Sequence, residues 1–176
     1  MRKISYYIVR VIAKFSNDGR ERICAYFRKG GARIGDNCAI SSNLDLCDKQ
    51  LLSIGNNVII SSDVLFVTHD ASYTILGDRT RSLFGEIKIG NNCFIGERST
   101  IMYGVELADN IIVAAGTVVT KSFKQQDVII GGNPAKVIST LDRFAEHSKN
   151  KGMLLSETFE AVKNQDGRLI KRKNFE

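Results

Sequence analysis

The chain has 176 residues and a hydrophobic fraction of 43%, which is enough for one folded domain with a core and is not typical of a disordered chain. It has no run of eighteen apolar residues, and its basic start lacks an apolar segment with a cleavage site. A membrane-spanning or secreted protein is therefore not expected. Residues 1–33 contain nine Lys and Arg and two acidic residues, which gives this segment a net charge of +7. The whole chain has a net charge of +6, so residues 34–176 carry −1. These cations are not interleaved with stacking aromatic residues as in a recognised nucleic-acid module.

Residues 1–29 are predicted to be helical. Apolar residues recur there at intervals of three and four, with Arg and Lys between them: Ile4, Ile8, Val11, Ile12 and Phe15. The segment Asn17-Asp18-Gly19 separates this first helix from a second, short one over residues 20–27. Two roles are open for the pair. It can cap the first coil of the repeat that follows, or lie on a membrane surface.

Residues 34–138 show a period of six, which is clearest from Ile89 onward. Each hexad there opens with an Ile, Leu or Val, and these residues are Ile89, Ile95, Ile101, Leu107, Val113 and Val119. The fifth residues can also face a core, and they are Cys93, Ser99, Val105, Ile111, Thr117 and Phe123. A helix needs apolar spacing of three and four, and a plain strand needs two. A period of six instead predicts a parallel β-helix in which three hexads close one coil.

The same hexads predict how the coils stack. First and fifth residues are expected to point inward onto their equivalents one coil away, about 4.8 Å along the axis. Recurring Gly and Asn are expected to supply the backbone angles at the corners. The phase is interrupted by a small insertion at residues 48–50 and by a long excursion, residues 70–86, directly after His69. A loop of that length in a compact coil is usually functional.

Three regions follow from this pattern. We expect a helical N-terminal cap over residues 1–33, the β-helix over 34–138, and a C-terminal helix and tail over 139–176, with the helix at about 141–150. The four cysteines show no CxxC spacing, and Cys38 and Cys93 fall at inward positions. We interpret them as small buried hydrophobic residues of a protein in the reducing cytoplasm.

Several motifs in this order resemble the hexapeptide-repeat acyltransferases. They are the repeats themselves, the Thr68-His69-Asp70 turn before the excursion, and the segments 114–121 and 131–138. The resemblance is greatest to the maltose, galactoside and nodulation-factor O-acetyltransferases. The short basic leader and the tail are more similar to acetyltransferases of capsule, exopolysaccharide or lipopolysaccharide assembly. The resemblance implies an all-β solenoid with a left-handed parallel β-helix, a homotrimer with active sites between subunits, and acetyl-CoA as acyl donor, without a metal.

His69 is the candidate catalytic residue. Acetyl transfer from a thioester to a hydroxyl needs a base for the hydroxyl proton, and imidazole suits that task near neutral pH. A lone histidine in a turn would ordinarily be only solvated, but the motif favours the catalytic base. No serine or cysteine stands in a convincing nucleophile arrangement, which favours direct transfer over an acyl-enzyme. The other histidine, His147, is interpreted as solvated.

The resemblance also implies residues that bind the substrates. The positions matching family contacts to the acyl donor are Glu97, Ala115, Thr120, Lys121 and Lys136. At the position of Glu97, the family contacts the donor through backbone atoms. Ala115 and Thr120 are also suitable residues for the corners of the coil. Lys121 and Lys136 can be ordinary surface charges. Ser41, with Asn43 two residues on, takes the place of an acceptor-binding asparagine. Asp70 has two possible roles. It either orients His69, which would place it beside the acceptor, or it is only the first residue of the excursion.

Three alternatives to sugar O-acetylation are weighed. An amino-sugar or xenobiotic amine could be the acceptor, with Asp45, Asp63 or Asp70 binding the ammonium group. A non-catalytic repeat scaffold would keep its function without His69. A zinc site of three histidines fails, because the chain has two and one lies outside the coil. The expected partners are a second and third copy of the chain and a sugar or polysaccharide-precursor acceptor, without nucleic acid. Peripheral contact with an inner-membrane face through residues 1–29 stays open.

Overall fold

The structure is a computed structural model that describes residues 6–44, 48–149, 157, 160 and 162–164. The chain forms two compact units, residues 1–140 and 141–176. The first contains the helices α1 (Tyr6–Lys14) and α2 (Gly19–Lys29) and the repeats. The second begins with α3 (Leu141–Ser148), which matches the start of the expected C-terminal helix. In the described parts of the chain, no helix combines the length and apolar character needed to cross a bilayer.

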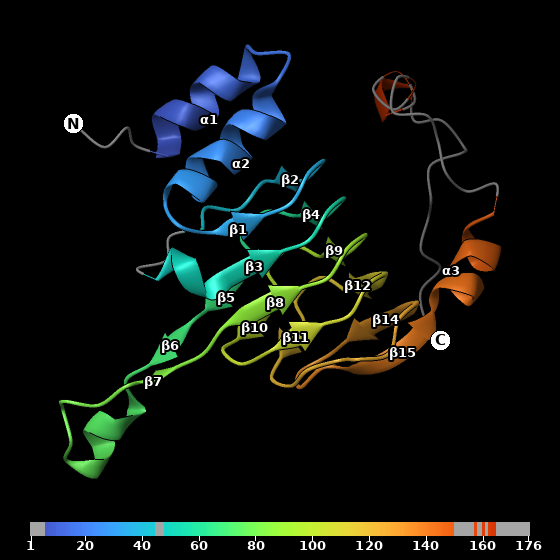
Figure 1. The fold of residues 1–176 in the computed structure, drawn as a ribbon. Helices are drawn as coiled ribbons and strands as arrows, with labels where there is room; N and C mark the ends of the chain where they lie inside the picture. The colour runs from blue at the N-terminus through green and yellow to red at the C-terminus, as the bar shows by residue number, and fades with distance from the viewer. Residues whose placement is uncertain (1–5, 45–47, 150–156, 158–159, 161, 165–176) are drawn as a thin grey trace. The chain divides into compact units, whose positions relative to one another are not determined.

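The repeats form a solenoid whose strands belong to three sheets (Figure 1). Sheet A contains β1 (Arg33–Ile34), β3 (Leu52–Ile54), β8 (Ile87–Ile89) and β11 (Glu106–Leu107). Sheet B contains β2 (Ala39–Ile40), β4 (Ile59–Ile60), β9 (Phe94–Ile95), β12 (Ile111–Val113), β14 (Val128–Gly131) and β15 (Lys136–Thr140). Sheet C contains β5 (Leu65–Val67), β10 (Thr100–Met102) and β13 (Val118–Val119).

Each coil passes from sheet A to B to C, and its strands pair with those of the next coil. These pairs are parallel, as in Ile60 beside Ile95 and Ile101 beside Val119. The exception lies at the end of the solenoid, where β15 turns back antiparallel on β14. The parallel β-solenoid expected from the period of six is confirmed.

The core follows the predicted hexad positions. From Ile89 to Phe123, the first and fifth residue of every hexad is at most 8% exposed. Cys93 packs there as a small buried residue, as expected, and Cys38 does so in the first coil. Both thiols are free, and so is that of Cys24.

The corners confirm one part of the glycine and asparagine prediction and correct another. At the fourth hexad position, Asn57 and Asn92 adopt positive φ angles of 57° and 54°. Their side chains form a hydrogen-bond ladder along the axis, in which Asn57 Nδ2 donates to Asn92 Oδ1 at 3.0 Å. Glycines at the second position do not have positive φ. A Cβ on Gly90 would instead lie 2.7 Å from the backbone carbonyl carbon of Ala108, so close coil stacking requires glycine there.

The two N-terminal helices pack on each other and on the first coil. Tyr6, Cys24 and Phe27 are buried with the coil's apolar residues. The Tyr6 hydroxyl donates to the Ser42 carbonyl at 3.1 Å, which fixes the start of α1 against the coil. Residues 1–5 of the expected helix lie outside the described residues.

Candidate active site

The excursion after β5 is a short antiparallel arm. It contains β6 (His69–Asp70), the 3₁₀ helix η2 (Ser72–Leu76) and β7 (Leu83–Phe84), and Figure 1 shows it projecting from the stacked coils. His69 pairs with Phe84 and Asp70 with Leu83. The Gly85 N–H donates to the Thr68 carbonyl at 3.1 Å and closes the base of the arm. His69 therefore stands where the arm leaves the solenoid.

Two neighbours define the position of the His69 imidazole. Its Nδ1 lies 3.2 Å from Oδ2 of Asp48, and its ring stacks on Phe84 with 5.5 Å between centroids. The His69 side chain is 44% exposed and that of Asp48 is 24% exposed, so the ring is accessible while its carboxylate partner is mostly covered. A proton on Nδ1 that is donated to Asp48 leaves the lone pair on Nε2. This arrangement suits proton abstraction from a hydroxyl.

Asp48 was missed as a site residue. It lies just before the 3₁₀ helix η1 (Lys49–Leu51), in the insertion that interrupts the first coil. That interruption, one coil before the histidine, is the signal that could have identified it. Asp70, which had been considered for the same role, has its Oδ1 2.6 Å from the Ser72 N–H, which donates to it at the start of η2. Asp70 thus stabilises the arm.

Asp48 and the predicted site residues other than Asp70, which lies in the arm, fall on two edges of the solenoid. One edge, between sheets C and A, carries Asp48, His69, Thr120 and Lys121; we call it the histidine edge. The other, between sheets B and C, carries the remaining candidates and is called the second edge: Ser41, Asn43, Glu97, Ala115 and Lys136. Within one chain, sheet C separates the two sets.

Backbone hydrogen bonds place the members of the second edge. The Glu97 carbonyl accepts from the Gly116 N–H at 2.8 Å, which stacks two successive corners. The Ala135 N–H donates to the Val118 carbonyl at 2.9 Å, which places the turn before Lys136 against the same edge.

Lysines on both edges are available for an anionic ligand. Lys121 is exposed, with its Nζ 5.7 Å from the centre of the Phe123 ring, and Lys136 is exposed at the start of β15. Neither forms an ion pair with a carboxylate in the described part of the chain. Among the described residues, no group of three His, Cys, Asp or Glu side chains is placed to hold a metal ion.

Comparison with known proteins adds a family to this geometry. A family model described as the hexapeptide repeat of succinyl-transferase matches residues 86–121. Protein CapG of Staphylococcus aureus is 40% identical over 122 residues, which cover 66% of this chain and 70% of CapG. The chain belongs to the hexapeptide-repeat acyltransferase family. This confirms the resemblance that the motifs indicated.

Two further relatives of this hexapeptide-repeat protein are informative. The galactoside O-acetyltransferase of Escherichia coli (strain K12) is 34% identical over 124 residues, 69% of this chain and 61% of that enzyme. A hexapeptide-repeat-containing acetyltransferase from Vibrio cholerae, solved with acetyl coenzyme A, superimposes with a TM-score of 0.61 over 77% of this chain and 85% of its own. At 23% identity, that structure supports the fold alone.

Proposed function

We propose that this protein transfers an acetyl group from acetyl-CoA to a hydroxyl of a sugar, with His69 as general base. The observation that carries the proposal is the His69–Asp48 pair, with 3.2 Å between Nδ1 and Oδ2 and the ring accessible beside the arm. A relative named for galactoside O-acetylation supports acetyl transfer to a sugar, and acetyl-CoA is the donor that the family resemblance implies.

The step assigned to His69 is a proton transfer. Its Nε2 takes the acceptor hydroxyl proton as the hydroxyl oxygen attacks the thioester carbonyl. The C–S bond then breaks, and the imidazolium returns the proton to the departing sulfur. Asp48 holds Nδ1 protonated and stabilises the imidazolium while it exists.

Direct transfer without an acyl-enzyme agrees with the state of the thiols. Burial raises the pKa of Cys24, Cys38 and Cys93 above the ordinary thiol value, and none is exposed. A buried, protonated thiol is a poor nucleophile. Cys47 lies outside the described residues.

The two edges support a site completed by a second copy. In a closed ring of three left-handed solenoids, each histidine edge would face a neighbour's second edge, since ring contacts join two different surfaces. His69, Thr120 and Lys121 would then meet Glu97, Ala115 and Lys136 across the interface. The lysines would bind the phosphates of acetyl-CoA, and the exposed backbone corners would hold its extended arm.

The acceptor would be bound by polar side chains of the second edge. Ser41 and Asn43 are both exposed on the second edge and could donate to sugar hydroxyls. Asp70 borders His69 but is engaged with Ser72. The resemblance to acetyltransferases of surface-polysaccharide assembly favours a precursor of such a polysaccharide as the acceptor.

The test is thiol release from acetyl-CoA with a panel of sugars, amino-sugars and chloramphenicol. Turnover with a hydroxyl acceptor should fall at least about a hundredfold in His69→Ala. His147→Ala is the matched control, because His147 is exposed in α3, and it should retain wild-type activity. Turnover with amines alone would move the proposal to N-acetylation. Absence of acetyl-CoA binding by calorimetry would leave a non-catalytic scaffold.

A further inference from the structure

The helix α1 presents apolar side chains to solvent as well as to the core. Its inner side carries Tyr6, which is buried against the first coil. Its outer side and the residue directly after its last turn carry exposed apolar side chains, which we call the α1 face: Tyr7, Ile8, Val11, Ile12 and Phe15, between 50% and 89% exposed. An exposed apolar face on a helix whose other side is already packed marks an interaction surface.

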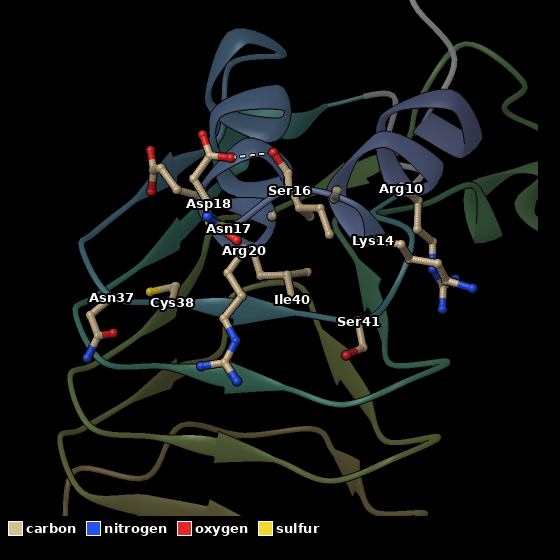
Figure 2. Close-up of a pocket in the computed structure, with 14 residues that line it drawn as sticks. Arg10, Lys14, Ser16, Asn17, Asp18, Arg20, Asn37, Cys38, Ile40 and Ser41 are labelled. Carbon is tan, nitrogen blue, oxygen red and sulfur yellow. Dashed lines mark hydrogen bonds between the residues drawn. The ribbon is translucent and has the colours of Figure 1, made fainter.

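Cations border the α1 face. Arg10 and Lys14 lie on one flank of the helix and, with Arg20 at the start of α2, line a cleft of about 670 Å³ between the two helices and β2. In Figure 2, Arg10 and Lys14 lie on one side of Ser41 and Arg20 on the other. No carboxylate forms an ion pair with these three cations in the part of the chain that the structure describes.

The acidic residues of the cleft are already neutralised. Asp18 Oδ1 lies 2.7 Å from Arg22 Nε, and Glu21 is paired with Arg28. Hydrogen bonds from Ser16 and Arg22 hold the pKa of Asp18 below its ordinary value. The cleft beside the α1 face therefore has an excess of positive charge, which suits phosphate groups.

We propose that the α1 face docks on an anionic lipid surface, with its apolar side chains at the level of the upper acyl chains. Arg10, Lys14 and Arg20 would then contact lipid phosphates. A second copy of the chain fits this face less well. Residues 1–33 have a net charge of +7, while the rest of the chain carries −1. Self-association through the α1 face would therefore bring like charges together. Membrane contact is independent of the proposed acetyl transfer.

The test is co-sedimentation of the full chain with vesicles of phosphatidylcholine alone or mixed with phosphatidylglycerol. The protein should bind the anionic vesicles and be released by high salt, because surface charges are screened. Arg10→Glu/Lys14→Glu should weaken binding more than tenfold. Its matched control is Lys124→Glu, another exposed lysine, which should bind close to wild type.

A second pair of variants tests how much the apolar side chains of the α1 face contribute to vesicle binding. Phe15→Ser should weaken vesicle binding several-fold, because the Phe15 side chain is 89% exposed and would insert. Ile75→Ser, at an 88% exposed apolar residue of η2, should bind like wild type. Equal binding to neutral and anionic vesicles, or no effect of Phe15→Ser, would overturn the proposal. A change of oligomeric state in Phe15→Ser by sedimentation velocity, without vesicle binding, would assign the α1 face to a second copy.

Discussion

Asp48 Oδ2 lies 3.2 Å from His69 Nδ1, although 21 positions separate the two residues in the chain. They meet because one coil stacks on the next at the histidine edge. Three hexads make eighteen positions, and the insertion near residues 48–50 lengthens the first coil to twenty, because Ile34 pairs with Ile54. The insertion thus places a carboxylate directly beside the candidate base.

Asp48→Asn should lower kcat by roughly tenfold to a hundredfold with a smaller change in KM. The asparagine amide can donate to Nδ1, which moves the imidazole proton to Nε2. Nε2 then has no lone pair with which to take the hydroxyl proton. Steady-state kinetics with the best sugar acceptor would measure this. Asp48→Glu should recover part of the loss if the carboxylate acts by holding the tautomer.

Asp70→Asn is the matched control for that variant. The asparagine oxygen can still accept the Ser72 N–H, so the arm should keep its start and the enzyme its activity. An equal loss of kcat in Asp70→Asn and Asp48→Asn would contradict the assignment of Asp48 as the positioning residue.

Thr68→Val should raise the free energy of unfolding by up to about 1 kcal/mol. Thr68 is 1% exposed, and its Oγ1 has no hydrogen-bond partner among the described residues. Thr117 is equally buried, but its Oγ1 donates to the Ala114 carbonyl at 2.6 Å. Thr117→Val should therefore lower the free energy of unfolding by about 1 kcal/mol. Urea unfolding curves would measure both variants, and equal destabilisation would indicate that Thr68 has a partner.

Asn92→Ala should destabilise the fold more than Asn92→Gly. Both variants lose the side-chain ladder, in which Asn92 accepts from Asn57 and donates to Asn110, each at 3.0 Å. Only alanine also forces a Cβ into the left-handed region, at a φ of 54°. The difference between the two should be about 1 kcal/mol in urea unfolding. Equal stabilities would mean that the corner relaxes without strain.

Alkaline pH should destabilise the protein partly through Cys24. Burial raises the pKa of the Cys24 thiol to about 11 from an ordinary value of 9.0, with Cys38 adding to the rise and Arg28 opposing it. The thiol ionises first in the unfolded chain, so its contribution to stability is complete below about pH 9 and is lost as the pH rises to about 11. The melting temperature of Cys24→Ala, measured with reductant, should fall less steeply over this interval. Parallel slopes would contradict the prediction.

The period of six could be interpreted from the sequence because it is local and repeated. Ile95 and Ser99 each face the core for the same reason as their equivalents one coil away, so every hexad carries the same information. The asparagine corners are equally local, since Asn tolerates positive φ. The role of glycines such as Gly90 was misjudged, because it depends on how closely the next coil approaches.

The sequence by itself determined the family, the parallel coil, its inward residues and His69 as the candidate base. These follow from motifs and from a repeat whose meaning does not depend on distant residues. Only the tertiary structure decided that Asp48, and not Asp70, faces His69, and that the candidate residues divide between two edges. The physical reason is that the stacking of coils decides which side chains meet. One short insertion shifts this stacking, and the residue pattern within a single hexad does not specify the shift.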